Sequence, residues 1–101
     1  MIVFTFMQKE LDDFGDCTNA YLVTNIFNTE EELLNEWLGY YDEEEDEGDG
    51  FMSYGLVDDE TGERVTEDKM KDILLGKYDD MEFYTESQYQ SYTFSVVNTE
   101  K

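Results

Sequence analysis

The chain has 101 residues, of which 27 are Asp or Glu, six are Lys or Arg and none is His, so its formal net charge is −21. Leu, Ile, Val and Phe contribute 24 residues, which exceeds the roughly 20% below which a highly charged chain stays unfolded. These totals exclude a disordered chain and a multi-domain protein, and they predict one folded domain over residues 1–101.

The single cysteine, Cys17, excludes an internal disulfide and suits a reducing compartment. No apolar run approaches the roughly 20 residues that span a bilayer, and no basic segment with a cleavage site follows Met1. An acidic protein is also repelled by anionic lipid surfaces. We therefore expect a cytoplasmic protein that does not contact membranes.

The first elements in chain order are two predicted strands, residues 2–7 and 21–27, which are rich in β-branched and aromatic side chains. A helix of about three turns follows. Thr29 and Glu32 match the capping-box pattern at its start, and apolar residues recur at helical spacing as far as Tyr41. We assign Tyr41 to the core because it continues this apolar stripe.

After the helix, the chain predicts an exposed acidic loop, two strands joined at a turn that ends on Gly62, a second helix and two more strands. These segments are residues 42–50, 51–58, 63–65, 66–76, 81–84 and 92–97. The order β-β-α-β-β-α-β-β predicts an α+β fold, a mostly antiparallel sheet of about five to six strands with two helices packed on one face.

Catalysis finds little support in the residues present. Without His, the chain lacks the side chain that titrates nearest neutral pH. A reactive cysteine needs a base or a cation beside it, whereas Cys17 follows Asp16, so we interpret Cys17 as filling an apolar gap. Carboxylates are too abundant for any pair to indicate glycoside hydrolysis. We expect no enzymatic activity and no cofactor, and we keep a carboxylate-only enzyme as a minor alternative.

Calcium is the metal that acidic residues favour, because hard cations take oxygen ligands. Aligning the required glycine of an EF-hand loop with Gly48 places Gly50 where an apolar residue belongs and Tyr54 where the bidentate Glu belongs. The template therefore fails. Weak binding of divalent cations by residues 42–50 and a calcium-responsive binding module remain alternatives.

The most organised feature is a block of 54 residues, from Glu10 to Glu63, that contains 19 acidic residues and no Lys or Arg. A domain of this length has a diameter of roughly 34 Å, and duplex DNA of that length carries about 20 phosphates. The charge of the chain is of that order, so the block predicts a surface for a basic partner protein. The predicted contacts are Glu31, Glu32, Glu36, Asp42, Glu43, Glu44, Glu45, Asp46, Glu47, Asp49, Asp58, Asp59 and Glu60.

Two simpler explanations compete with this one. A short charged loop is often only solvated, which accounts for residues 42–49 but less well for the whole block. Proteins adapted to high salt are also acidic, but their acids are spread evenly, whereas here they are clustered among many aromatic residues. Tyr40, Tyr41 and Tyr54 flank the acidic loop and offer faces for a partner's Arg, with a place in the core as the alternative, which the apolar stripe favours for Tyr41.

In size, charge and lack of catalytic residues, the chain resembles small acidic inhibitors encoded by phages and mobile elements, including DNA-mimicking anti-CRISPR and anti-restriction proteins. The resemblance is one of character, and no family motif matches. It implies an inhibitor that occupies the nucleic-acid site of a host nuclease, such as the PAM-reading region of a CRISPR effector, without binding nucleic acid itself. An immunity protein or antitoxin that neutralises a basic nuclease is a related alternative.

Overall fold

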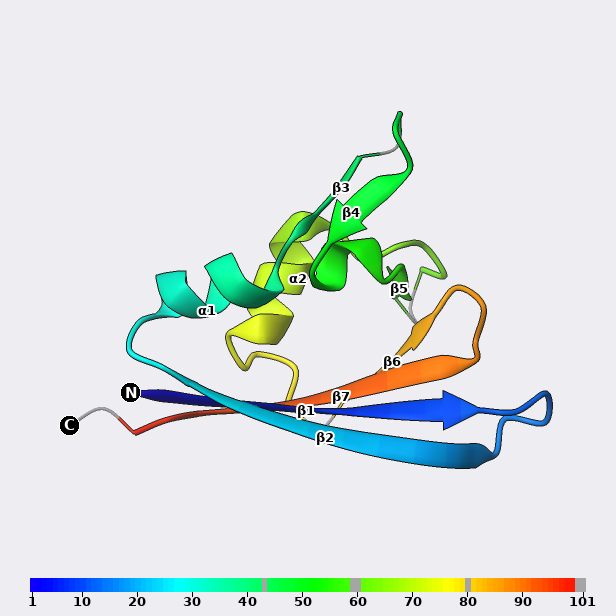
Figure 1. The fold of residues 1–101 in the computed structure, drawn as a ribbon, viewed down its shortest axis with the longest axis horizontal. Coiled ribbons are helices and arrows are strands. Elements are labelled where there is room, and N and C mark those ends of the chain that lie inside the picture. The colour runs from blue at the N-terminus through cyan, green and yellow to red at the C-terminus, as the bar shows by residue number, and fades with distance from the viewer. Residues whose placement is uncertain (43, 59–60, 80, 100–101) are drawn as a thin grey trace.

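The structure is a computed structural model that describes residues 1–42, 44–58, 61–79 and 81–99 (Figure 1). In chain order its elements are β1 (Ile2–Leu11), β2 (Cys17–Phe27), α1 (Glu30–Trp37), β3 (Tyr40–Asp42), β4 (Glu47–Asp49), the 3₁₀ helix η1 (Phe51–Ser53), β5 (Leu56–Val57), α2 (Glu67–Leu74), β6 (Glu82–Thr85) and β7 (Gln90–Asn98). Both helices lie on one face of the larger sheet (Figure 1). The predicted α+β class is confirmed.

The larger sheet has the strand order β2-β1-β7-β6-β5 within the described residues, and every neighbouring pair is antiparallel. Strand β1 is central to its longest part: Ile2 lies opposite Phe27 of β2 and opposite Asn98 of β7. Because directly opposed residues share a face, this register sorts the side chains into a helix-facing set and an open-face set. The other face of the sheet carries no helix (Figure 1).

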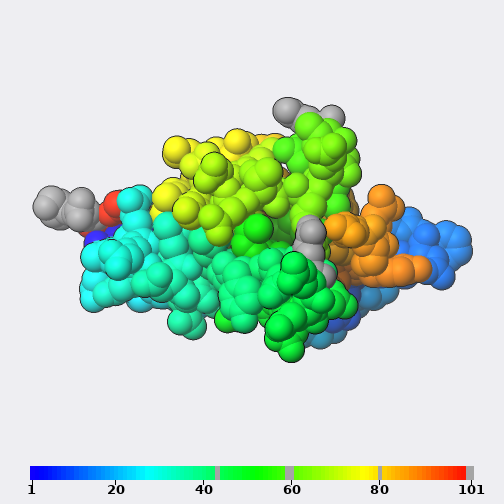
Figure 2. All heavy atoms as spheres, turned by 90° about the horizontal axis from the view of Figure 1, so that it is seen from above, coloured from blue at the N-terminus to red at the C-terminus, as the bar shows by residue number. Residues whose placement is uncertain are grey.

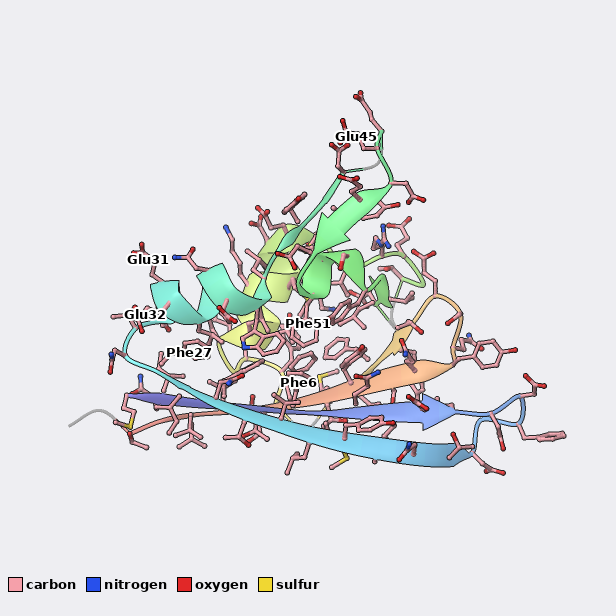
Figure 3. All side chains as sticks on the ribbon, viewed as in Figure 1. Phe6, Phe27, Glu31, Glu32, Glu45 and Phe51 are labelled. Carbon is pink, nitrogen blue, oxygen red and sulfur yellow. The ribbon has the colours of Figure 1, made fainter. Side chains whose placement is uncertain are left out.

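The core lies between the sheet and the helices. Alternate residues of β1 point into it, so that Phe4 and Phe6 are buried there. Phe6 meets Phe51 of η1 and Trp37 of α1 edge-on, with ring centroids 5.1 Å apart in both pairs. Figure 3 shows Phe6 and Phe51 pointing toward one another across the space between sheet and helices. These rings supply much of the apolar area that a small, highly charged domain needs.

Both helices begin at the predicted threonines. Thr29 Oγ1 accepts a hydrogen bond from the backbone N–H of Glu32, and Thr66 Oγ1 accepts one from that of Lys69, each at 3.2 Å. Helix α1 ends at Trp37 and is shorter than the three turns that the sequence predicts. Gly39, with φ +69°, turns the backbone out of the helix. Tyr41 therefore lies on β3, half-buried, outside the core to which the sequence assigns it.

The described part of residues 42–50 is exposed, apart from the half-buried Gly50, but it is not an irregular loop, because much of it belongs to a β-hairpin. Strands β3 and β4 pair with Tyr40 opposite Asp49 and Asp42 opposite Glu47. The carboxylate side chains obscure the strand signal in the sequence because Asp and Glu are depleted in strands. Figure 1 shows this hairpin projecting away from the sheet.

The predicted strand at residues 51–58 is also wrong in its first part. Phe51 to Ser53 form a 3₁₀ helix, and only Leu56 and Val57 join the sheet. Glycines at both ends, Gly50 with φ +61° and Gly55 with φ +71°, turn the chain and allow Phe51 to enter the core. Gly62 has the predicted positive φ, at +73°, and residues 59–60 of that turn lie outside the described residues.

Cys17 does not fill an apolar gap. It is exposed at the start of β2, where its Sγ donates to the carbonyl oxygen of Asn19 at 3.3 Å. Strand β2 is an edge strand, and its first six residues are all exposed. The apolar gap that the sequence interpretation requires is therefore absent at this position.

Candidate interaction surface

Helix α1 presents the first group of predicted contact residues. Its first turn is acidic, as the helix dipole favours, and the carboxylate of Glu32 accepts the backbone N–H of Asn28 at 3.0 Å. Leu33 is fully buried on the opposite side and holds the helix to the core. Figure 3 shows Glu31 extending from α1 on the side away from the sheet, and Glu32 beside the start of the helix.

The hairpin formed by β3, β4 and the turn between them carries the second group, and we call it the acidic hairpin. Asp42 accepts the backbone N–H of Glu44 at 3.0 Å, and Asp46 accepts the hydroxyl of Tyr41 at 2.7 Å. Asp46 has φ +53°, a conformation that Asp tolerates better than most residues. Local hydrogen bonds therefore order the turn, and Glu45 stands at its tip (Figure 3).

Three glycines fix the acidic hairpin against the end of α1 and against η1. A Cβ on Gly39 would lie 1.7 Å from the carbonyl oxygen of Asp49, and a Cβ on Gly48 would lie 2.6 Å from the Cβ of Ser53. A Cβ on Gly50 would meet the carbonyl oxygen of Trp37 at 2.6 Å. Only glycine permits such close backbone approaches, so the hairpin is seated on the domain.

Arg64 is the cation that the structure places against the acidic hairpin. Its guanidinium carbon lies 4.4 Å from the centre of the Tyr41 ring, and its Nε lies 3.4 Å from a carboxylate oxygen of Glu86. The hydrogen bond to Asp46 is the main reason that the pKa of Tyr41 is raised; partial burial adds to the rise, and Arg64 opposes it. Tyr41 thus links the hairpin turn to a cation that is already paired.

The other described cations also pair with acids outside α1 and the acidic hairpin. Lys9 pairs with Glu82, Lys71 with Glu67, Lys77 with Asp72 and Lys69 with Asp58. No ion pair within the described residues reaches a carboxylate of α1 or of the acidic hairpin. The negative charge of these two elements is therefore uncompensated within the described part of the domain.

We define the acidic strip as the predicted contact residues that are exposed on these two elements: Glu31, Glu32, Glu36, Asp42, Glu44, Glu45, Asp46, Glu47 and Asp49. Helix α1 and the acidic hairpin are neighbours in sequence, and Figure 2 shows them adjoining on one side of the helix-covered face. The structure thus brings nine of the predicted contact residues onto two adjacent, well-anchored elements.

The remaining predicted contacts do not join the strip. Asp58 is half-buried and forms an ion pair with Lys69 of α2. Glu43, Asp59 and Glu60 lie outside the described residues. Asp58 therefore has a structural partner within the domain, unlike the carboxylates at the tip of the hairpin.

Sequence reasoning missed two features of the surface. One is the contact of Arg64 with Tyr41, residues far apart in sequence with no local pattern to link them. The other is the uncharged edge strand β2, whose signal was present: Cys17–Phe27 contains no Asp, Glu, Lys or Arg.

No preformed calcium site is present among residues 1–42, 44–58, 61–79 and 81–99, since no three Asp, Glu, His or Cys side chains lie close enough there to hold a metal ion. The acids of the hairpin alternate between the two sides of the strands or engage their own backbone.

In the described chain, no helix has the length and apolar character that crossing a bilayer requires. Comparisons with protein-family models, curated proteins and solved structures found no match for this chain.

Proposed function

We propose that the protein is an inhibitor that presents the acidic strip to the nucleic-acid-binding site of a basic host enzyme. The observation that carries the proposal is the absence of any described ion pair to the strip, although every described cation has a carboxylate partner elsewhere. Uncompensated like charges repel one another and destabilise the folded state. Their concentration on two anchored elements supports a role outside the domain.

The dimensions of the molecule support mimicry of nucleic-acid charge. Its longest extent is 45 Å, a length over which duplex DNA carries about 26 phosphates. The net charge of −21 is of the same order. Carboxylates held on a folded scaffold then replace phosphates in a groove of Lys and Arg, where electrostatic complementarity speeds association and selects basic partners.

The partner class that fits is a DNA- or RNA-handling enzyme of host defence, such as a CRISPR effector or a restriction enzyme, in the bacterial cytoplasm. Such enzymes hold nucleic acid in positively charged channels. The protein supplies no catalytic group in this scheme. It competes with nucleic acid for the channel and binds neither DNA nor RNA.

Capture from a bacterial lysate, followed by competition with duplex DNA, tests this proposal. We expect the immobilised protein to retain a nucleic-acid enzyme that is released both by raised salt and by added DNA, because DNA and the strip occupy one site. Recovery of an enzyme that DNA does not displace, or recovery of no basic protein, would contradict the proposal. The identity of the enzyme separates a defence nuclease from a toxin nuclease.

A charge variant locates the contact. Replacing Glu44, Glu45 and Glu47 by Gln and Asp46 by Asn removes four charges from the hairpin tip. Asn suits the positive φ at position 46 and keeps an acceptor for Tyr41. We expect weaker inhibition of the captured enzyme and a domain at least as stable as the parent, because repulsion is relieved.

The matched control removes four charges elsewhere, with Asp13, Asp16 and Asp68 replaced by Asn and Glu63 by Gln. The two variants have equal net charge, so only position differs between them. Inhibition unchanged in the hairpin variant would remove the hairpin from the mechanism. Equal loss in both variants would show that total charge, and not the strip, governs binding.

A further inference from the structure

The two edges of the larger sheet differ strongly in length and in how they are covered. Strand β5 forms one edge and has only two residues, Leu56 and Val57. Its outer side is occupied, because Val57 forms a bridge to Arg64 and the N–H of Val65 donates to the carbonyl of Leu56 at 2.8 Å. Strand β2 forms the other edge, has eleven residues and pairs only with β1 among the described strands.

Strand β2 has few of the devices by which proteins protect a long edge: one bulge lies near its start, at Thr18, where its register with β1 shifts. Natural edge strands are kept from pairing by charges, by prolines, by bulges or by shortness. In this chain 33% of residues are charged, so a segment of eleven would hold about four charges at the average frequency. Cys17–Phe27 holds none and contains no proline. Its side chains include Leu22, 67% exposed, and Ile26, 62% exposed.

The hydrogen-bond phase of β1 shows which backbone groups of β2 point out of the sheet. The N–H of Leu11 donates to Tyr89, and the carbonyl of Met1 accepts from Thr99, each at 2.8 Å, so the odd-numbered residues of β1 direct their backbone groups toward β7. The even-numbered residues of β1 therefore face β2 and engage its odd-numbered residues. The backbone groups of four residues in the regular part of β2, Asn19–Phe27, consequently point out of the sheet: Ala20, Leu22, Thr24 and Ile26. The N–H of Ala20 donates locally to Oδ1 of Asn19 at 3.1 Å, a bond that pairing with another strand would replace.

We propose that β2 pairs with β2 of a second copy of this chain, antiparallel, about a two-fold axis at Leu22. Leu22 has the most exposed large apolar side chain of β2, at 67%, and an axis there sets Leu22 opposite Leu22 and Ala20 opposite Thr24 of the other copy. Ala20, Leu22 and Thr24 of each copy then form three hydrogen-bonded pairs, which together contain about six bonds. That number lies within the range found in protein interfaces.

A second copy fits this edge better than a flexible peptide for two reasons. Its β2 is already extended, so pairing requires little ordering of the backbone. It is also uncharged along the same eleven residues, so no carboxylate of the strand enters the interface. The paired dimer covers part of Leu22 and Ile26, two of the most exposed apolar side chains of the described chain. This inference does not depend on the proposed function.

The surrounding charges make a distinct prediction about salt. Antiparallel pairing brings the start of β2 in one copy near its end in the other, so Asp16 of each copy approaches the first turn of α1, which begins at Glu30. Each copy also carries a net charge of −21. Screening weakens this repulsion, so raising the salt concentration strengthens the dimer. Binding of a basic partner to the acidic strip has the opposite dependence.

A cysteine at the axis tests the register directly. In a Cys17→Ser background, Leu22→Cys places two thiols at a hydrogen-bonded pair, whose Cα separation of about 5.5 Å suits a disulfide. Ala20→Cys in the same background is the control, since its two thiols lie about 13 Å apart along the strands. We expect rapid disulfide dimerisation of the first variant alone under mild oxidation in 0.5 M salt. Equal cross-linking of both variants, or of neither, would overturn the proposal.

A charged edge tests the pairing in the unmodified fold. We expect the parent protein in 0.5 M salt to have twice the 11.9 kDa mass of one chain by light scattering, and Leu22→Lys to have the mass of one chain. Val97→Lys is the control: Val97 is also on the open face, 53% exposed, but lies on the interior strand β7. Dissociation by Val97→Lys alone would indicate face-to-face packing and overturn edge pairing. A monomeric parent at all salt concentrations would also overturn it.

Discussion

The acidic strip and the β2 edge differ in their charge and in whether their backbone groups offer hydrogen bonds to a partner. The strip carries nine exposed carboxylates on α1 and the acidic hairpin, and no described cation compensates them. Strand β2 carries no charge over eleven residues, and no described strand pairs with its outer side. One chain thus separates a surface suited to a basic protein from a surface suited to a strand.

This separation keeps unpaired carboxylates away from the sheet, although the chain has a net charge of −21. On the open face of the sheet, the described charged residues Lys9 and Glu82 lie 3.6 Å apart and neutralise one another. Glu82 also accepts hydrogen bonds from Ser91 at 2.7 Å and from Tyr84 at 2.9 Å. Carboxylates on this face have partners within the domain, whereas those of the strip do not.

The largest expected effect comes from removing the residue that joins the acidic hairpin to the sheet. Phe51 follows the acidic hairpin directly, is 1% exposed and meets Phe6 of the sheet with ring centroids 5.1 Å apart. We expect Phe51→Ala to lower the free energy of unfolding by about 3–5 kcal/mol, because a buried ring is replaced by a cavity. Urea unfolding followed by the fluorescence of Trp37 measures this.

Phe14→Ala provides the matched control, since Phe14 is 89% exposed in the turn between β1 and β2. We expect a change within about 0.5 kcal/mol for this variant. Similar effects of the two substitutions would show that Phe51 does not anchor the hairpin to the sheet.

An intermediate effect is expected from a substitution that displaces the acidic hairpin and leaves the rest of the molecule in place. Gly39→Ala requires a side chain at φ +69° and sets its Cβ 1.7 Å from the carbonyl of Asp49, so β4 must move. We expect a loss of about 1–3 kcal/mol in unfolding free energy and weaker inhibition, with self-association through β2 unchanged. Gly15→Ala is the control, because Gly15 has φ +82° but no atom within 4 Å of the added Cβ. Equal losses would assign the whole effect to backbone strain.

The smallest effect concerns the compensated carboxylate of the open face. Hydrogen bonding from Ser91 is the main reason that the pKa of Glu82 lies below its usual value of 4.5; bonding from Tyr84 and the charge of Lys9 add to this, while burial opposes it. Its ionised form therefore stabilises the fold above pH about 5, and this contribution disappears as pH falls through the lowered pKa. We expect Glu82→Gln to cost less than about 1 kcal/mol at pH 7, given the exposure of the group.

Chemical unfolding of the parent and Glu82→Gln between pH 7 and pH 3 checks this sign. The difference between the two proteins should shrink as the pH falls. A difference that stays constant or grows would contradict the assignment. The contrast with the hairpin charge variant is informative, because removing those uncompensated carboxylates should not destabilise the domain at any salt concentration.

The sequence predicted those parts of the fold that depend on local patterns. Thr29 and Thr66 mark the starts of their helices, because each side chain accepts a backbone N–H within the first turn. The strands of the sheet follow from runs of β-branched and aromatic residues. The acidic hairpin could not be predicted in this way, because its strands are stabilised by close backbone contacts at Gly39, Gly48 and Gly50, which no periodicity records.

The candidate surface was predictable in composition but not in arrangement. The run without Lys or Arg predicts that α1 and the acidic hairpin are acidic, and the structure shows that these two elements adjoin. The pairing of Asp58 with Lys69 depends on how α2 packs. The sequence alone therefore could not show that Asp58 lies outside the acidic strip. The role of β2 as an edge likewise depends on strand order, which local patterns do not specify.

The salt dependence of binding to the captured enzyme tests the central claim most directly. Equilibrium titrations at several salt concentrations would compare the parent, the hairpin charge variant and the control variant of equal net charge. The acidic strip predicts that affinity falls with salt, that the hairpin variant binds more weakly with a shallower dependence, and that the control follows the parent. Identical salt dependence for the two variants would contradict it, because binding would then depend on total charge and not on where the carboxylates lie.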